Sequence, residues 1–359
     1  MIDNKLTPGM NVGGGGNRHR GISHLRILAS ISVVWLHMCS LLADYRELFE
    51  LNDSQFLFYQ TTYYLMRWAV PCFFMITGAL LIGRQIEYPV LLKKYVLRIF
   101  LALLIFGIPF GLIKIFLEEK TVSVSMIGNS LLMIAEGKAS VLLWYLYALI
   151  GIYLIHPVLN KIVELPKNTL YWLLSVLFVF NFALPFLASI ADIEMAFYIP
   201  MGYTLFYVLI GYCVKNDHLP FLNYKWVRIT GIVIPVITII LSCKYRVFPK
   251  ELISYQSPLI ALCSTCVFAV FMNIKGEKNA RHEREKRREI VWKVDRLCFG
   301  VYLIHPVVIQ MLYRFLKMTP VRYNHYVVAT MISYLEILVI CFAGSKIMSL
   351  IKPLKKYVL

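Results

Sequence analysis

The stretch "SHLRILASISVVWLHMCS", residues 23–40, carries no charged side chain between Arg26 and His37. A helix of this length, at about 1.5 Å per residue, crosses most of a hydrocarbon core of about 30 Å. Similar runs recur along the chain, where 59% of the 359 residues are hydrophobic and 16% are charged, whereas soluble domains carry about 25% charged residues. Lipid offers backbone polar groups no partner, so such runs must be helices. The sequence therefore predicts an all-α polytopic membrane protein.

Hydropathy predicts about ten transmembrane helices. A further apolar stretch near residues 124–135 is shorter, which favours an interfacial or re-entrant segment. The predicted spans are residues 22–43, 56–83, 90–117, 141–160, 169–190, 197–214, 227–243, 254–274, 297–316 and 324–351.

The distribution of charged residues predicts that both termini are cytoplasmic. With the amino terminus inside, lysines and arginines minus aspartates and glutamates give +17 for the inside segments and −2 for the outside segments, as the positive-inside rule requires. We expect a flexible cytoplasmic tail (1–21), a transmembrane domain (22–352) with a charged cytoplasmic loop (275–296), and a second cytoplasmic tail (353–359). This topology and an attraction to anionic membrane lipids account for the basic charge, and we expect no nucleic-acid partner.

Arg26 and His37 are the most informative residues of the first span. They are eleven residues apart, so at about 100° per residue they share one face and lie about 16 Å apart along the helix axis. Ionisable side chains inside a membrane are costly and usually face a cavity or a partner. The pair suits a channel in which Arg26 holds an anionic donor at the cytoplasmic mouth and His37 acts as a general base. The structural alternative is a buried histidine that only hydrogen-bonds a neighbouring helix.

Basic residues also occur in the second and third spans. Arg67 lies four residues before Pro71, and the proline should kink that helix. The third span opens with "LLKKYVLRIF" (91–100), in which Lys94 and Arg98 are i,i+4 neighbours. These cations either extend to lipid phosphates or form a cradle for a phosphate-rich cofactor.

Five phrases in order form a pattern along the chain. They are the arginine, ten residues and histidine of the first span, "VPCFFMITGALL" (70–81), "LWYLYALIGIYLIHPVL" (143–159), "FYVLIGY" (206–212) and "FGVYLIHPVV" (299–308). This pattern resembles the acyltransferase-3 family of bacterial integral-membrane O-acyltransferases over roughly residues 22–350. Through "FFMITG" it is most similar to the enterobacterial-common-antigen O-acetyltransferase branch.

The resemblance implies a ten-helix protein of the bacterial cytoplasmic membrane. It implies an acyl group, usually acetyl, that is taken from acyl-coenzyme A on the cytoplasmic side. The acceptor would be a hydroxyl of a surface glycan or of its undecaprenyl-linked precursor. Residue by residue, the family's functional positions match Arg26, His37, Arg67, Arg98, Tyr302 and His305 of this chain.

This chain departs from the family pattern at three positions. Ser23 stands where the family commonly has an aspartate, three residues before the first arginine. Tyr95 replaces an arginine of the third helix, and Leu142 replaces a histidine before the fourth. The last two positions are associated in the family with donor or acceptor binding.

The resemblance and the residues together give a candidate site. We expect His37 and Arg26 to be catalytic, with His37 taking the proton of the acceptor hydroxyl. Either direct transfer or an acyl-histidine intermediate is compatible with these residues. Arg67 or Tyr302 would stabilise the oxyanion. Acetyl-coenzyme A would be bound by Arg26, Lys94, Arg98 and Arg67, and the substrate pocket would be lined by Arg67, Trp144, Tyr302 and His305.

Two other functions fit the same residues less well. Buried arginines and histidines also suit a transporter or flippase of a small polar or lipid-linked substrate, and a membrane scaffold would not depend on His37. Binding of coenzyme A would separate an acyltransferase from a transporter. We expect no metal site, because Cys263 and Cys266 form a C-x-x-C within an apolar run, where cysteines are typical core residues.

Overall fold

The computed structural model describes residues 15–119, 123, 125–193, 199, 202–245, 254–274 and 289–358, and these residues form helices and connecting turns without a strand. The first half contains α1 (Gly15–Asp44), α2 (Asp53–Leu65), α3 (Ala69–Leu81), α4 (Tyr88–Val90), η1 (Leu91–Val96), α5 (Leu97–Glu119), α6 (Ser125–Ala135), η2 (Val141–Leu143), α7 (Trp144–Leu154) and α8 (His156–Glu164). The second half contains α9 (Lys167–Phe178), η3 (Val179–Ala183), α10 (Leu184–Ile190), α11 (Gly202–Lys215), η4 (Pro220–Asn223), α12 (Lys225–Tyr245), α13 (Pro258–Met272), α15 (Cys298–Gln310), η6 (Met311–Phe315), η7 (Pro320–Arg322), α16 (Tyr326–Leu350) and α17 (Lys352–Tyr357).

Helices lie at all ten positions where hydropathy predicts a span. Within the described residues, seven of them are long and apolar enough to cross a membrane. The fourth is divided into α7 and α8, which meet at 59°. The sixth and eighth, α11 and α13, have 14 and 15 residues, which is shorter than the about 20 residues of a full span. Both helices are largely buried by neighbouring helices.

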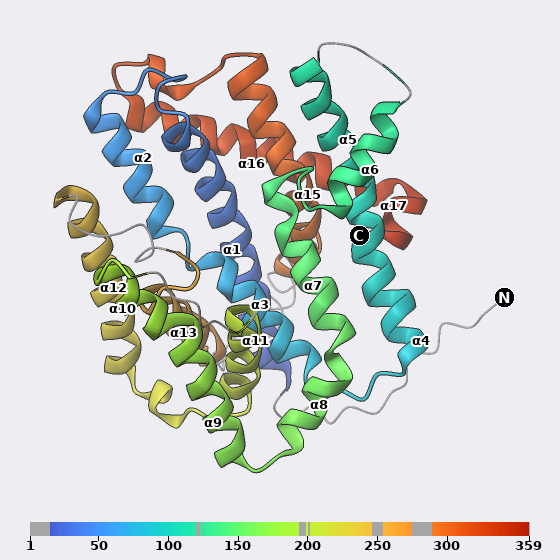
Figure 1. The fold of residues 1–359 in the computed structure, drawn as a ribbon, viewed down its shortest axis with the longest axis vertical. Coiled ribbons are helices and arrows are strands. Elements are labelled where there is room, and N and C mark those ends of the chain that lie inside the picture. Colours follow the sequence, from blue (N-terminus) through green and yellow to red (C-terminus); the bar gives the residue numbers. More distant parts are fainter. Residues whose placement is uncertain are drawn as a thin grey trace.

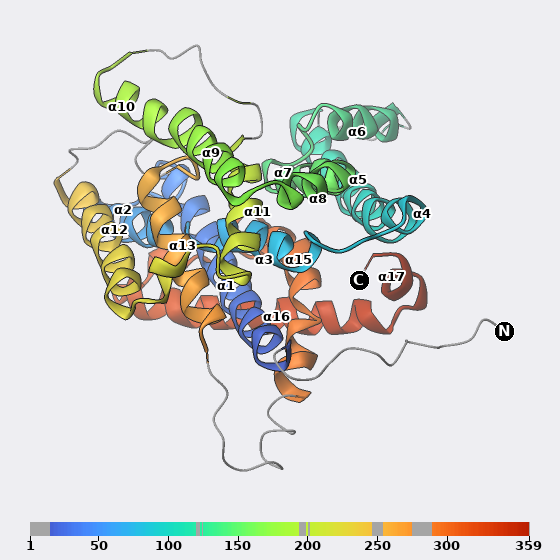
Figure 2. The ribbon, with the colours of Figure 1, turned by 90° about the horizontal axis from the view of Figure 1, so that it is seen from below.

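The centre of the bundle is built from α1, α3, α11 and α13, with α5, α9, α12 and α16 around them (Figures 1 and 2). α3 and α11 approach closely because each has a glycine at the crossing. A methyl group at Gly78 would overlap the carbonyl oxygen of Val208, and one at Gly211 would overlap that of Met75. Small residues of this kind let the backbones of membrane helices touch, and the crossing anchors the core.

The second predicted span is interrupted where the sequence predicts a kink. α2 ends at Leu65 and α3 begins at Ala69, so Arg67 lies in the turn between them. Pro71 lacks the amide donor that would bond the carbonyl of Arg67, and its ring clashes with that carbonyl. The break turns the side chain of Arg67 into the interior, where tyrosines surround it.

The same reasoning explains the bend in the fourth span. α7 ends at Leu154 and α8 begins at His156. Pro157 cannot bond the carbonyl of Tyr153, which opens the helix there. His156 is buried at the bend with its Nε2 3.2 Å from the carbonyl oxygen of Leu81, so this histidine joins α8 to α3.

Candidate active site

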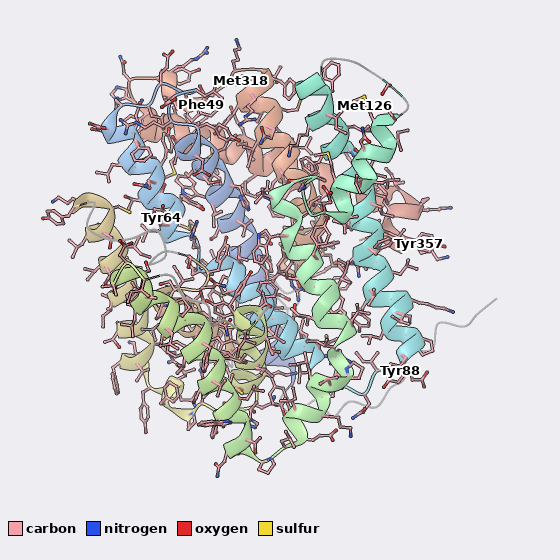
Figure 3. All side chains as sticks on the ribbon, in the orientation of Figure 1. Phe49, Tyr64, Tyr88, Met126, Met318 and Tyr357 are labelled. Atoms are coloured by element: carbon pink, nitrogen blue, oxygen red, sulfur yellow. The ribbon has the colours of Figure 1, made fainter. Side chains whose placement is uncertain are left out.

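A cavity of about 1230 Å³ lies between α1, α15 and the segment before α7. It extends from His37 to the loops that hold Phe49 and Lys317. Phe49 and Met318 mark the same end of the molecule in Figure 3, whereas Tyr88 lies toward the other end. Among the described residues, His37 is the only histidine in its lining, and Tyr63, Trp144 and Tyr255 line it as well.

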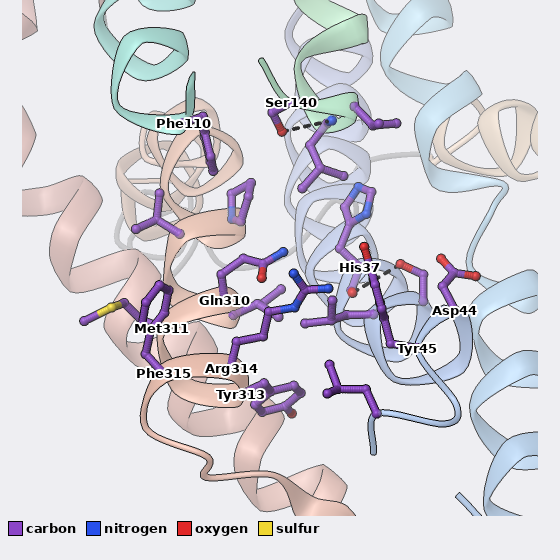
Figure 4. A pocket seen from close by; sticks show the side chains of 18 of the residues that line it. His37, Asp44, Tyr45, Phe110, Ser140, Gln310, Met311, Tyr313, Arg314 and Phe315 are labelled. Atoms are coloured by element: carbon purple, nitrogen blue, oxygen red, sulfur yellow. Dashed lines mark hydrogen bonds between the residues drawn. The ribbon is translucent and has the colours of Figure 1, made fainter. Parts of the chain in front are cut away.

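His37 faces this cavity from α1 (Figure 4). Its ring stacks on that of His305 in α15, with centroids 5.2 Å apart and planes inclined by 28°. The two histidines that the sequence selects from opposite ends of the chain are therefore adjacent. His37 is half-buried and His305 is completely buried, so His37 presents a ring to the cavity while His305 supports it from behind.

The ring of His305 is held by its own helix. Its Nδ1 lies 3.1 Å from the carbonyl oxygen of Val301. A proton on Nδ1 would make that contact a hydrogen bond and leave Nε2 as an acceptor. Nε2 is buried and has no hydrogen-bond partner among the described residues. The contact with Val301 fixes the ring through Nδ1 and leaves Nε2 available as an acceptor.

Arg67 lies behind the aromatic wall of the cavity. Its guanidinium is hydrogen-bonded to the hydroxyl of Tyr63 and lies over the rings of Tyr63, Tyr64 and Tyr255, at 4.6, 5.1 and 5.4 Å from their centroids. Arg67 and His305 are both close enough to His37 to act on it electrostatically. A fixed positive charge beside the candidate base is what a developing oxyanion would require.

Tyr302 connects the cavity to the other end of the bundle. Its hydroxyl donates a hydrogen bond of 2.8 Å to the carbonyl of Leu142, and its ring lies 6.0 Å from His305 and 5.6 Å from Tyr145. Tyr145 is in turn within electrostatic reach of Arg26. A continuous chain of ring contacts thus joins His37 to the neighbourhood of Arg26.

Arg26 forms an ion pair that the sequence did not predict. Its Nη1 lies 2.7 and 2.8 Å from the two carboxylate oxygens of Asp295. The hydroxyl of Ser23 donates a hydrogen bond of 2.8 Å to the same carboxylate. Asp295 lies in the charged segment just before the ninth predicted span. It places a carboxylate beside Arg26, as the aspartate would that the family pattern has at the position of Ser23.

Arg98 and Arg26 approach the same side chain. Both are within electrostatic reach of Tyr153 in α7. Arg98 donates a hydrogen bond of 2.8 Å from Nε to the carbonyl of Val358, beyond α17, and lies over the ring of Phe299. Lys94 is exposed one turn earlier, in η1. Three of the four basic residues predicted to bind the donor, Arg26, Lys94 and Arg98, thus lie toward the end of the bundle away from the cavity opening, whereas Arg67 lies beside His37.

The structure therefore divides the predicted site residues into two groups. His37 and Trp144 line the cavity, and Arg67 and His305 lie behind the lining beside His37. Arg26, Lys94 and Arg98 lie toward the other end, and Tyr302 lies between the two groups. Sequence reasoning missed Asp295, Tyr63, Tyr255 and Arg314. Arg314 alone had a usable signal, since it is an arginine within a predicted span. No group of three or more histidine, cysteine or acidic residues in the described part of the chain could hold a metal ion.

Comparison with protein families gives one match for this chain. The model of the acyltransferase-3 family, described as an acyltransferase domain, matches residues 19–348. Comparisons with curated proteins and with solved structures give no match. The matched range begins before Arg26 and ends within α16, so it includes both groups of site residues.

Proposed function

The chain belongs to the acyltransferase-3 family and is a multi-pass membrane acyltransferase, and we propose that it moves an acetyl group from acetyl-coenzyme A to a hydroxyl of a surface glycan or of its undecaprenyl-linked precursor. We place it in the bacterial cytoplasmic membrane with ten spans and both termini inside, because that orientation collects the positive loop charge on the cytoplasmic side. The resemblance of "FFMITG" (73–78) to the common-antigen branch favours acetyl as the acyl group.

The basic residues away from the cavity opening support a donor site on the cytoplasmic side. In the proposed topology, Lys94 and Arg98 lie near the inner surface, and Arg26 and Arg98 converge on Tyr153. Arginine and lysine bind phosphate groups through charge-assisted hydrogen bonds. Asp295 offsets much of the charge of Arg26. Lys94 and Arg98 would therefore hold the coenzyme A phosphates, and Arg26 would orient the donor as it enters the bundle.

The stacked position of His37 at the inner end of the cavity is the observation that carries this proposal. An acceptor that enters the cavity from outside meets His37 at its inner end, and the buried His305 stacks on the ring of His37 from behind. A histidine positioned in this way can take a proton from a hydroxyl, which is typically worth about 10²–10⁴-fold in rate.

The reaction follows from these roles. His37 accepts the hydroxyl proton as the acceptor oxygen forms a bond to the acyl carbon. The carbonyl electrons move to oxygen, and the charge of Arg67 stabilises the resulting oxyanion. Collapse of that intermediate breaks the carbon–sulfur bond, and the departing thiolate receives a proton from protonated His37. The same residues would serve a two-step route in which a histidine nitrogen carries the acyl group across to the acceptor.

The deciding experiment uses purified full-length protein and labelled acetyl-coenzyme A. We expect the wild type to bind the donor and release the acetyl group, and His37→Ala to bind the donor without turnover. Donor binding with unchanged turnover in His37→Ala would remove His37 from the chemistry and make His305 the next residue to test. Absence of both binding and turnover in the wild type would favour the transporter or flippase alternative.

A further inference from the structure

Arg314 reaches the cavity but has no part in the chemistry proposed above. It belongs to η6 (Met311–Phe315), the π-helical turn that follows α15. Turns of this kind inside helices often occur at functional sites. Figure 4 shows the guanidinium of Arg314 directed into the cavity, next to Gln310. Arg314 lies nearer to the opening of the cavity than His37 does.

No ion pair joins Arg314 to an acidic side chain within the part of the chain that the structure describes. Its Cζ lies 4.1 Å from the centroid of the Tyr45 ring, a distance typical of a cation–π contact. Its Nε is buried and has no hydrogen-bond partner among the described residues. Buried donors are rarely left without an acceptor in native proteins, so a bound anion would satisfy a donor that the described residues leave without one.

The charge of the cavity wall points to the nature of that group. The described residues of the lining include three lysines and two arginines against two acidic residues. The Nζ of Lys138 forms an ion pair at 3.0 Å with a carboxylate oxygen of Glu136. Apolar walls with an excess of one sign of charge concentrate ligands of the other sign. The basic residues are Lys114, Lys138, Arg314, Lys317 and Arg322, and the acidic ones are Asp44 and Glu50.

We propose that the outer part of this cavity is an anion site, and that the acceptor carries a carboxylate or phosphate that binds Arg314 while its hydroxyl reaches His37. The proposal rests on the acyl-transfer function and adds the class of acceptor. The planar guanidinium can bind either oxyanion through two parallel hydrogen bonds, and Tyr45 holds it in place. Phe49 and Trp144 supply aromatic faces on which a sugar ring can stack. An acidic sugar and a diphosphate-linked glycan both meet this description.

The test measures binding in the absence of donor, with the full-length protein in nanodiscs. The probes are a labelled hyaluronan tetrasaccharide, the same tetrasaccharide with its carboxylates reduced to alcohols, and farnesyl diphosphate-linked N-acetylglucosamine. The variants are Arg314→Gln and Arg314→Lys. Lys244→Gln is the matched control, because it removes a cation from the end of α12, outside the cavity lining.

We expect at least one anionic probe to bind the wild type about ten-fold or more tighter than the neutral tetrasaccharide. A preference for the carboxylate probe identifies an acidic sugar, and a preference for the diphosphate probe identifies a lipid-linked glycan. Arg314→Gln should abolish the preference, Arg314→Lys should keep part of it, and Lys244→Gln should leave it intact. Equal binding of neutral and anionic probes, or an unchanged preference in Arg314→Gln, would overturn the proposal.

Salt provides a measurement that needs no variant. Binding of the anionic probe to the wild type should weaken as ionic strength rises, while binding of the neutral probe should stay constant. An affinity for the anionic probe that does not change with salt would count against the site. Acetyl-coenzyme A turnover is measured on the same preparation. Turnover without anion preference would refute only the anion site, whereas anion preference without donor binding or turnover would refute the acyl-transfer function.

Discussion

The imidazole rings of His37 and His305 stack with centroids 5.2 Å apart, although 268 positions separate them in the chain. His305 is fixed through Nδ1 by its own helix and is completely buried, whereas His37 faces the cavity. We therefore expect His305 to be a positioning residue. The stack sets the orientation of the candidate base before any substrate arrives.

Removing the stack should lower the turnover number. We expect His305→Ala to reduce kcat by about 10- to 100-fold, because a small displacement of a catalytic group is costly, with little change in KM for acetyl-coenzyme A. His305→Phe retains a ring and should recover part of the loss. His156→Gln is the matched control, since His156 stands in the same "YLIHP" phrase but contacts Leu81. An equal loss of kcat in the control, measured per folded molecule, would argue against a specific role for His305.

The oxyanion should depend on Arg67 more than on Tyr302. Tyr302 already donates its hydroxyl proton to Leu142, whereas Arg67 brings a charge close to His37. We expect Arg67→Gln to lower kcat by about 10²–10³-fold. Tyr302→Phe should lower kcat by less than about ten-fold and the free energy of unfolding by about 1 kcal/mol. Steady-state kinetics on both variants show which substitution lowers kcat more. A larger loss of kcat in Tyr302→Phe would assign stabilisation of the oxyanion to Tyr302.

The Arg26–Asp295 ion pair should stabilise the fold. Its two side chains are 28% and 8% exposed, so we expect Asp295→Asn to cost about 2 kcal/mol, less than the 3–5 kcal/mol typical of a fully buried pair. Adding Ser23→Asp should restore part of that loss, because position 23 lies one turn before Arg26 and its side chain already reaches the carboxylate. Thermal unfolding in detergent measures each effect. Additive losses in the double variant would show that position 23 cannot replace Asp295.

The crossing of α3 and α11 should tolerate no side chain. Gly78→Ala and Gly211→Ala place a methyl group against the backbone of the facing helix, so we expect each variant to lose most of its folded protein. Gly128→Ala in α6 is the control, because a methyl group there meets no atom within 4 Å, and helix propensity favours alanine. The yield of monodisperse protein after extraction is the measurement. Normal yields from both core variants would mean that the helices can separate without loss of the fold.

Local features of the sequence were sufficient to predict where the helices lie. Apolar runs locate helices at all ten predicted positions, and Pro71 accounts for the break beside Arg67. The bend at His156 was not expected, although Pro157 gives the same local signal. The burial of α11 and α13 by other helices could not be read from hydropathy, because apolar side chains face lipid and protein interior alike.

Contacts between residues far apart in the chain could not be predicted from the sequence. Arg26 was recognised, but its partner Asp295 is 269 residues away in a run with many charged side chains. Which acid pairs with an arginine depends on how two helices cross, and periodicity within one helix carries no information about that. The family resemblance selected His37 and His305 separately, and only the packing of α1 against α15 shows that they touch.

The aromatic chain from His37 through His305, Tyr302 and Tyr145 has an electrical consequence. An elementary charge that crosses a membrane held at 100 mV releases about 2.3 kcal/mol, so an open aqueous path through the protein would dissipate the membrane potential if the enzyme, as proposed, takes its donor from one side and its acceptor from the other. The packed rings lie between the cavity and the neighbourhood of Arg26, where the proposed donor enters. In the proposed topology they act as insulation, and a variant that removes them would make the membrane conduct ions even while the protein remained folded.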